Sequence, residues 1–200
     1  MTRLPGEERR SQLLTEAIRS FGHDGFDGTS LDGVAQAAGV RKQTLLYYFP
    51  NKEALFAACV DELSAALADA LERVLESKEL GWQRVESVIR GLFALAVEQP
   101  DLLLFAREAA RRSPEIVQRV ADDLEPLRKR AIRFLESEME EGRFRTQDPR
   151  LLLFTLYTAI VGSLTEAGVL RAMGGGRTGR LALKRREEEL IEFVRRALEV

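Results

Sequence analysis

The stretch that decides the fold of this chain is TSLDGVAQAAGVRKQTLLYYFPNK, residues 29–52. Apolar residues recur within it at helical spacing in two short runs, over residues 31–38 and 45–49. Gly39 ends the first run, in a left-handed conformation that only glycine adopts at low cost. Pro50 breaks the second run. Two short helices joined by a glycine-containing turn predict a helix-turn-helix.

Helices are also expected on both sides of this pair. Before it, the apolar side chains between Leu13 and Phe21 form one helical face, and we expect Gly22 and Gly25 to end that helix. Thr29 or Ser30 can cap the helix that follows. From Lys52 to Val74, apolar residues recur every three or four positions, which predicts one long helix of about six turns.

The second short helix has a polar side that suits DNA. It carries two cations, an amide and three hydroxyls, and a further lysine follows it: Arg41, Lys42, Gln43, Thr44, Tyr47, Tyr48 and Lys52. Cations and hydroxyls bind phosphates, and glutamine can read an adenine edge in the major groove, which is wide enough to admit a helix. The formal net charge of the whole chain is −2, but residues 33–52 contain three cations and no acid, and DNA binding needs only such a local patch.

At these residues the chain resembles the TetR family of bacterial transcriptional repressors. The resemblance rests on TSLDGVAQAAGV (29–40), Thr44-Leu45 and YYFPNKEAL (47–55), and it covers about residues 10–56. It implies a homodimer whose N-terminal domains bind a palindromic operator. It further implies that a small molecule entering the C-terminal domain changes the spacing of the two N-terminal domains.

The resemblance also implies DNA contacts at particular positions. Phosphate or base contacts are expected from Thr29, Lys42, Thr44, Tyr47, Tyr48 and Lys52, and base reading near Gln43. The chain departs from the family pattern at Arg41, Gln43, Leu46 and Tyr48, where the family often has serine, a small residue, tyrosine and histidine. These departures leave the operator sequence and the effector unpredicted.

The rest of the chain is also predicted to form helices. The expected ranges are 82–97, 101–112, 114–141 with a kink or break at Pro126, 149–173 and 180–198, with a glycine loop at 174–176. We therefore predict an all-α fold of about nine helices. Its N-terminal helix-turn-helix domain of three helices occupies residues 1–51, and a C-terminal ligand-binding and dimerisation domain occupies residues 52–200.

Two further sites are predicted in the C-terminal domain. Large side chains on its helices are candidates for lining an effector pocket: Trp82, Phe93, Phe105, Phe134 and Tyr157. A stripe of small residues and a stripe of apolar residues on its last two helices are candidates for a four-helix dimer interface: Ala159, Gly162, Ser163, Ala167, Leu183, Leu190, Ile191 and Val194. The many leucine and aromatic residues favour an apolar effector.

The residue inventory argues against enzyme chemistry. The chain has one histidine and one cysteine, Cys59, and it shows no cluster with metal-ligand spacing, no phosphate-binding glycine loop and no nucleophile elbow. We therefore expect no cofactor and no metal. Its longest apolar stretch, 151–164, is shorter than the roughly 20 residues of a membrane span, so we expect a cytoplasmic protein. The alternative function is a helical protein-interaction module without ligand-regulated DNA binding.

Overall fold

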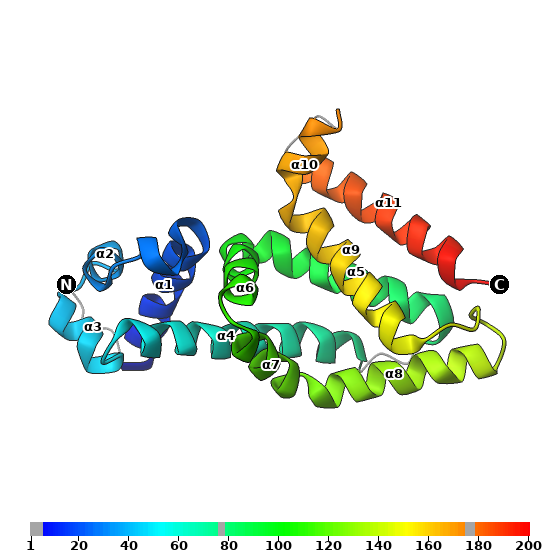
Figure 1. The fold of residues 1–200 in the computed structure, drawn as a ribbon, viewed down its shortest axis with the longest axis horizontal. Coiled ribbons are helices and arrows are strands. Elements are labelled where there is room, and N and C mark those ends of the chain that lie inside the picture. The colour runs from blue at the N-terminus through cyan, green and yellow to red at the C-terminus, as the bar shows by residue number, and fades with distance from the viewer. Residues whose placement is uncertain (1–5, 76–78, 175–178) are drawn as a thin grey trace. The chain divides into compact units, whose positions relative to one another are not determined.

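The chain is built from helices. The structure is a computed structural model that describes residues 6–75, 79–174 and 179–200, without the side chains of Leu75 and Ala167. Within these residues the helices are α1 (Gly6–Gly28), α2 (Leu31–Ala37), α3 (Lys42–Tyr48), α4 (Lys52–Leu75), α5 (Gly81–Glu98), α6 (Pro100–Arg112), α7 (Pro114–Asp123), α8 (Glu125–Glu140), α9 (Pro149–Thr165), α10 (Ala167–Ala172) and α11 (Arg180–Leu198) (Figure 1). The all-α prediction is confirmed.

The helices form two compact units. The first unit is Met1–Ala66 with Pro100–Asp123, and the second is Leu67–Gln99 with Leu124–Val200, as far as these residues are described. Helix α4 contributes to both units, and α6 and α7 group with the N-terminal helices. This grouping differs from the linear division at residue 51 that the sequence suggested. The functional division into a reading domain and a sensing domain stays a prediction.

Helix α1 packs against α6 within the first unit, and the pair meets at a glycine. A Cβ atom at Gly22 would lie 2.9 Å from the backbone nitrogen of Phe105 and 3.1 Å from the carbonyl oxygen of Asp101. Gly22 therefore lies inside the helix and allows the two backbones to approach, so the prediction that it ends the helix is wrong. The chain turns at Gly25 instead, where φ is 72°, and α1 resumes up to Gly28.

Gly22→Ala is expected to destabilise the protein by about 1–3 kcal/mol, because the added methyl group meets backbone that cannot rotate away. Chemical denaturation of the variant and of the unchanged protein measures this difference. Gly168→Ala is the matched control, since a Cβ there has no heavy atom within 4 Å and alanine favours the helix. Equal stability of Gly22→Ala and the unchanged protein would show that the helices can separate at no cost.

Three of the helix boundaries that local sequence signals predicted are found in the structure. Ser30 accepts a hydrogen bond from the Gly33 amide at 3.0 Å and caps α2. Asn51 does the same for α4 through the Ala54 amide at 2.7 Å. Gly39 has a φ of 66°, as the left-handed turn requires. The caps and this turn fix where α2 begins, where it ends and where α4 begins.

The C-terminal region differs in two places from the expected helices. The helix predicted over 114–141 is divided at Leu124 into α7 and α8, because Pro126 lies in the first turn of α8. The helix predicted to end near residue 173 is interrupted at Glu166, between α9 and α10. Of the expected glycine loop, Gly175 and Gly176 lie outside the described residues.

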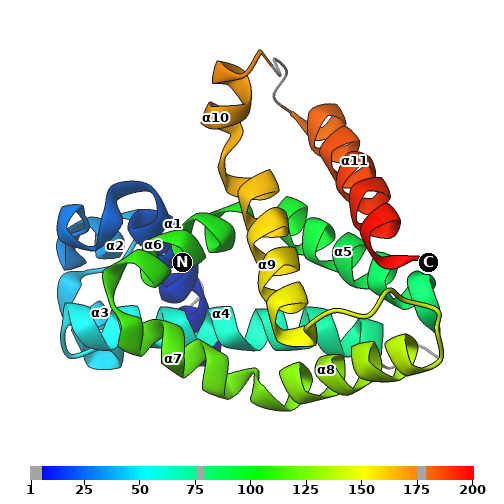
Figure 2. The same cartoon turned by 45° about the vertical axis from the view of Figure 1, so that its right-hand side comes forward.

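The core of the second unit lies where α11 packs against α5 and α9 (Figure 2). Its buried side chains include Ile89 and Phe93 of α5, Ile160 of α9 and Leu198 of α11. On each of these helices, one apolar face points into this core.

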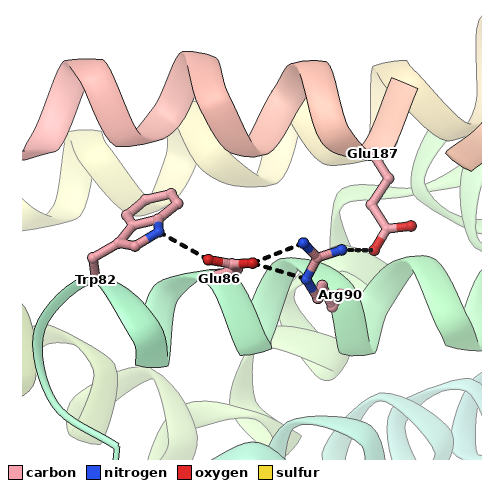
Figure 3. Close-up of polar contacts among 4 residues, drawn as sticks. All are labelled: Trp82, Glu86, Arg90 and Glu187. Carbon is pink, nitrogen blue, oxygen red and sulfur yellow. Dashed lines mark hydrogen bonds and ion pairs between the residues drawn. The ribbon is translucent and has the colours of Figure 1, made fainter. Parts of the chain in front are cut away.

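A chain of polar contacts ties α5 to α11 (Figure 3). The indole nitrogen of Trp82 donates to Glu86 at 2.9 Å, and the guanidinium of Arg90 donates to the other oxygen of Glu86 at 2.7 and 2.9 Å. The same guanidinium donates to Glu187 of α11 at 3.1 Å. These contacts give the indole N–H of Trp82 an acceptor and join α5 to α11 by an ion pair.

Candidate functional site

Helix α3 presents its polar side to solvent. Arg41, Lys42 and Gln43 are exposed, and Tyr47 is 84% exposed, the largest fraction among the large hydrophobic side chains described. No acid lies on α3 itself, so the side of the helix that faces outward is cationic at its start and aromatic at its end.

The opposite side of α3 anchors it to the first unit. Leu45 is fully buried and Phe49 is nearly so, as their spacing of four residues predicted. The guanidinium of Arg10 in α1 lies 5.4 Å from the centre of the Phe49 ring, a cation–π contact. Leu45, Phe49 and the Asn51 cap of the helix that follows fix the position of α3. The outward side chains of α3 are therefore held on a rigid element.

Lys42 has an intramolecular partner. Its ammonium group lies 2.6 Å from a carboxylate oxygen of Asp32 in α2, and both side chains are exposed. An exposed ion pair of this kind contributes only about 0–1 kcal/mol, so a phosphate can replace the carboxylate at small cost. The pair links α2 to α3 and holds the lysine at the start of the outward side.

The two tyrosines differ in their surroundings. Their rings meet edge to face with centroids 5.1 Å apart, but Tyr47 points to solvent and Tyr48 is half-buried. Thr44 is also half-buried. Tyr47 is therefore the aromatic residue of α3 best placed to touch a bound molecule, and Tyr48 supports its ring.

Thr29 does not present its side chain to the surface. It is 5% exposed, and its hydroxyl donates to the Gly25 carbonyl at 2.8 Å. The hydroxyl thus secures the turn at Gly25, and we withdraw Thr29 from the predicted DNA contacts.

Lys52 is half-buried and also has internal partners. Its ammonium group lies 4.4 Å from the centre of the Phe26 ring and 3.5 Å from the Asp27 carbonyl oxygen, at the end of α1. A phosphate contact from Lys52 would have to form beside these contacts.

Helix α6 contacts the end of α1 through residues that sequence reasoning did not assign to this contact. The Glu108 carboxylate accepts a hydrogen bond from the Phe26 amide at 3.4 Å, just after the turn at Gly25. The Arg112 guanidinium lies 3.4 Å from the centre of the Phe26 ring. In the sequence, only the spacing of four residues between Glu108 and Arg112 indicated that they share one face of a helix. This spacing could not indicate which other helix that face contacts.

The five residues predicted to line an effector pocket do not all come together. Trp82 and Phe93 belong to the packed core of the second unit. Phe105 is 0% exposed and lies in the first unit, with its ring centroid 5.1 Å from that of Phe56. Tyr157 is exposed, and Phe134 packs against the core and lines a groove in the second unit. The sequence identified these side chains as large and helical but not the direction in which each points.

The predicted dimer stripe on the last helix faces the chain's own core. Leu190, Ile191 and Val194 are buried among α5 and α9 residues, and Leu183 packs against them. Leu190, Ile191 and Val194 are therefore covered within the single chain, whereas Leu183 is only half-buried and stays a predicted interface residue. An amphipathic helix buries its apolar stripe against whatever core lies nearest, and here that core is intramolecular.

The small residues of α9 that were predicted for the dimer interface are not all covered within the single chain. Ala159 and Ser163 are half-buried, and a Cβ added at Gly162 would meet no heavy atom within 4 Å. The side chain of Ala167 lies outside the described residues. Gly162 therefore marks a place where another helix could approach the α9 backbone closely.

Helix α9 also exposes large apolar side chains that the sequence-based prediction did not include, apart from Tyr157. Leu151, Phe154 and Tyr157 are each more than half exposed. Leu151, Phe154, Thr158 and Gly162 follow helical spacing and so share one side of α9. We call this side the α9 face. Phe193 of α11 is also exposed, at 66%. Large adjacent apolar side chains in water are typical of a protein interface.

Cys59 is enclosed in α4. It is fully buried, and burial raises the pKa of its thiol far above the usual value, with the carboxylate of Glu62 adding to the effect. A thiol that stays protonated is a poor nucleophile, so a redox-sensing role is disfavoured.

Cys59 is expected to resist alkylation by iodoacetamide in the folded protein, even at mildly alkaline pH, and to react when denaturant unfolds the chain. Because the thiol pKa is raised in the folded state, the free energy of unfolding should fall as the pH rises past the ordinary thiol value. Above that pH only the unfolded state loses the proton. Mass spectrometry of the labelled protein measures the reaction. Fast native labelling would contradict the burial.

The described residues show neither a candidate metal site nor a candidate membrane span. No group of three or more histidine, cysteine, aspartate or glutamate side chains there is arranged to hold a metal ion. None of the described helices combines the length and the apolar character needed to cross a membrane.

Comparisons with known proteins agree with this geometry. Residues 13–59 match the family described as "Bacterial regulatory proteins, tetR family". The chain is 30% identical over 166 residues to the uncharacterized HTH-type transcriptional regulator YhgD of Bacillus subtilis. The aligned region covers 77% of this chain and 83% of YhgD.

Solved structures share the fold over nearly the whole chain. The ketosteroid transcriptional regulator KstR2 of Mycobacterium tuberculosis superposes with a TM-score of 0.79 at 19% identity, over 96% of this chain and 95% of KstR2. AibR, solved in complex with isovaleryl coenzyme A and operator DNA, superposes with a TM-score of 0.75 at 18% identity, over 92% and 97% of the two chains. Both likenesses concern the fold.

Proposed function

This chain belongs to the TetR family of bacterial regulatory proteins, and from that premise we propose that it is a transcriptional repressor that binds a palindromic operator as a homodimer in the cytoplasm. A small-molecule effector with a largely apolar body releases it from the DNA. Its relatives are transcriptional regulators and not enzymes, in agreement with the prediction from the residue inventory.

The observation that carries the proposal is the outward polar side of α3. Helices α2 and α3 pack against each other, and α3 is anchored by Leu45 and Phe49 with Gln43 and Tyr47 pointing away from that anchor. A helix held in this way can enter a major groove, where glutamine reads a base edge and the cations at its start bind phosphates. The proposed contacts come from Arg41, Lys42, Gln43, Thr44, Tyr47, Tyr48 and Lys52.

A palindromic operator follows from two-fold symmetry. Two copies of α3 related by such an axis read identical half-sites about 34–36 Å apart, one turn of the duplex. We propose that the second copy docks on the α9 face, with Gly162 allowing close approach and Leu151 and Phe154 buried between the chains. A homodimer of this kind buries apolar side chains that a monomer leaves in water.

The proposed effector acts by favouring one spacing of the two α3 helices over another. A ligand weakens operator binding only by its differential affinity for the two arrangements. The complex of AibR with isovaleryl coenzyme A supports a small-molecule effector with an apolar part. Helix α4 is the element that runs from the reading helices into the second unit, and we propose that it transmits the change.

Selection of bound duplexes from a random DNA pool tests the proposal. The expected result is a palindrome with half-sites one helical turn apart, whose affinity falls steeply with salt. Compounds that release the protein from the selected duplex then identify the effector. If the protein binds no duplex at low salt, the alternative of a helical protein-interaction module gains instead.

A further inference from the structure

The second unit contains a groove that the proposed function does not use. It has a volume of about 400 Å³ and lies between the start of α5 and one side of α8. Leu80 and Arg84 line it from the α5 side. Its size is within the range of sites that hold small molecules.

The groove has an apolar surface at its base. Phe134 of α8 is half-buried, and its ring packs edge to face on that of Phe144, with centroids 6.2 Å apart. Leu80 is 63% exposed beside it. A ring fixed by a second aromatic ring offers a rigid flat surface to a ligand.

Guanidinium groups surround this apolar base. Four arginines line the groove and only two glutamates do so. Arg84 lies with its guanidinium carbon 5.2 Å from the centre of the Phe134 ring. Arg130 and Arg133 come from the adjoining turns of α8, and both are exposed. Positive charge gathered along one cleft focuses the local potential and attracts anions.

The two glutamates offset only part of this charge, and the same arginine bonds both of them. Glu138 is 1% exposed, and the Arg143 guanidinium bonds both of its carboxylate oxygens as well as Glu141. Hydrogen bonds to Glu138 and then to Glu141 raise the pKa of Arg143, and those from Arg143 and Ser137 lower the pKa of Glu141. With four guanidinium groups against two carboxylates, the lining has a formal net charge of +2.

We infer that this groove binds a small organic anion, with its phosphate or carboxylate group on the arginines and an apolar or planar part against Phe134 and Leu80. Arginine suits both ends of such a ligand, since its planar fork matches the oxygens of either anion and its face stacks on aromatic rings. This inference concerns binding in the second unit and does not depend on DNA recognition by α3.

The test compares three probes in titrations of the full chain followed by ligand-observed NMR. Phenyl phosphate supplies both features, inorganic phosphate supplies the anion alone, and phenol supplies the ring alone. Phenyl phosphate is expected to bind at least tenfold more tightly than either of the others, and benzoate in place of phenyl phosphate shows whether carboxylate is preferred. Equal affinities for the three probes, or no binding at millimolar concentrations, would overturn the inference.

Variants assign the binding to the groove. Arg133→Gln is expected to weaken phenyl phosphate binding about tenfold, because one charged hydrogen-bond donor is removed from an exposed position. Ser137→Asp should weaken it further by placing a negative charge in the lining. Arg196→Gln is the matched control, since this exposed arginine of α11 does not line the groove.

Binding that is unchanged in Arg133→Gln and in Ser137→Asp would show that the probe binds elsewhere. Operator binding by the same samples distinguishes this failure from a failure of the proposed function. Neither substituted residue lies on α3, so both variants are expected to bind DNA as the unchanged protein does.

Discussion

Gln43→Ala is expected to lower the affinity for the selected operator by about 1–3 kcal/mol, roughly 5- to 150-fold. Gln43 is exposed on the outward side of α3, where its amide can make two hydrogen bonds to one base. The loss should therefore be confined to one base pair of each half-site. Fluorescence anisotropy with operators altered one base pair at a time measures both the loss and its position.

Lys42→Ala gives the contrasting result that separates base reading from phosphate binding. It should weaken binding to all sequences about equally and reduce the slope of log affinity against log salt by about 0.9 for each phosphate that the protein no longer neutralises. Gln118→Ala on α7 is the control for Gln43→Ala, because it removes an exposed glutamine of the same unit outside the helix-turn-helix. If Gln43→Ala changes neither affinity nor base preference, α3 does not read DNA in the proposed orientation.

Phe154→Asp is expected to convert the dimer into monomers. Phe154 is 63% exposed in the single chain, so the change costs that chain little. In a two-fold interface the residue occurs twice, and losing about 2–3 kcal/mol of burial on each side raises the dissociation constant roughly a thousandfold or more. Sedimentation equilibrium measures the change, and far-ultraviolet circular dichroism checks that the helices remain.

Val117→Asp is the matched control for this change. Val117 is also an exposed apolar residue, at 47%, but it lies on α7 in the first unit. Val117→Asp should stay dimeric, whereas Phe154→Asp should also lose tight binding to the palindrome, because a monomer engages one half-site only. A dimer that survives Phe154→Asp would show that the chains associate through a surface other than the α9 face.

The two proposed interfaces constrain each other. In the proposed dimer the half-sites must match the separation of the two α3 helices, and that separation depends on how the α9 faces meet. The proposal therefore assigns operator spacing to the side of α9 that bears Phe154 and Gly162, and operator sequence to α3. A variant that reshapes the α9 face without breaking the dimer should change the preferred spacing and leave the half-site sequence intact.

Local sequence signals were reliable wherever a residue acts on its own neighbours. Ser30, Gly39 and Asn51 set the boundaries of α2 and α4 as predicted, because capping and left-handed turns involve only a few consecutive residues. The outward side of α3 followed equally from spacing, since Leu45 and Phe49 had to point inward. The sequence also contained the family pattern that the comparisons confirm.

Local sequence patterns gave wrong predictions where a residue contacts another residue that is distant in the sequence. Gly22 has the local character of a helix terminator, yet it lies inside α1 because α6 approaches it at Phe105. Leu190 and Ile191 have the spacing of an interface stripe, yet α5 and α9 of the same chain cover them. Periodicity gives the direction of a side chain about its own helix axis but not the element that it meets.

The amino-acid sequence by itself determined that this chain is helical, where α2 begins and ends, where α4 begins, and that α3 carries an outward polar side. Only the tertiary structure decided that α6 packs on α1 and contacts Phe26, that the α9 face is exposed in the single chain and that arginines from α5 and α8 line one groove. The physical reason is range: capping and helical periodicity act over one or two turns, whereas burial and charge depend on residues tens of positions apart.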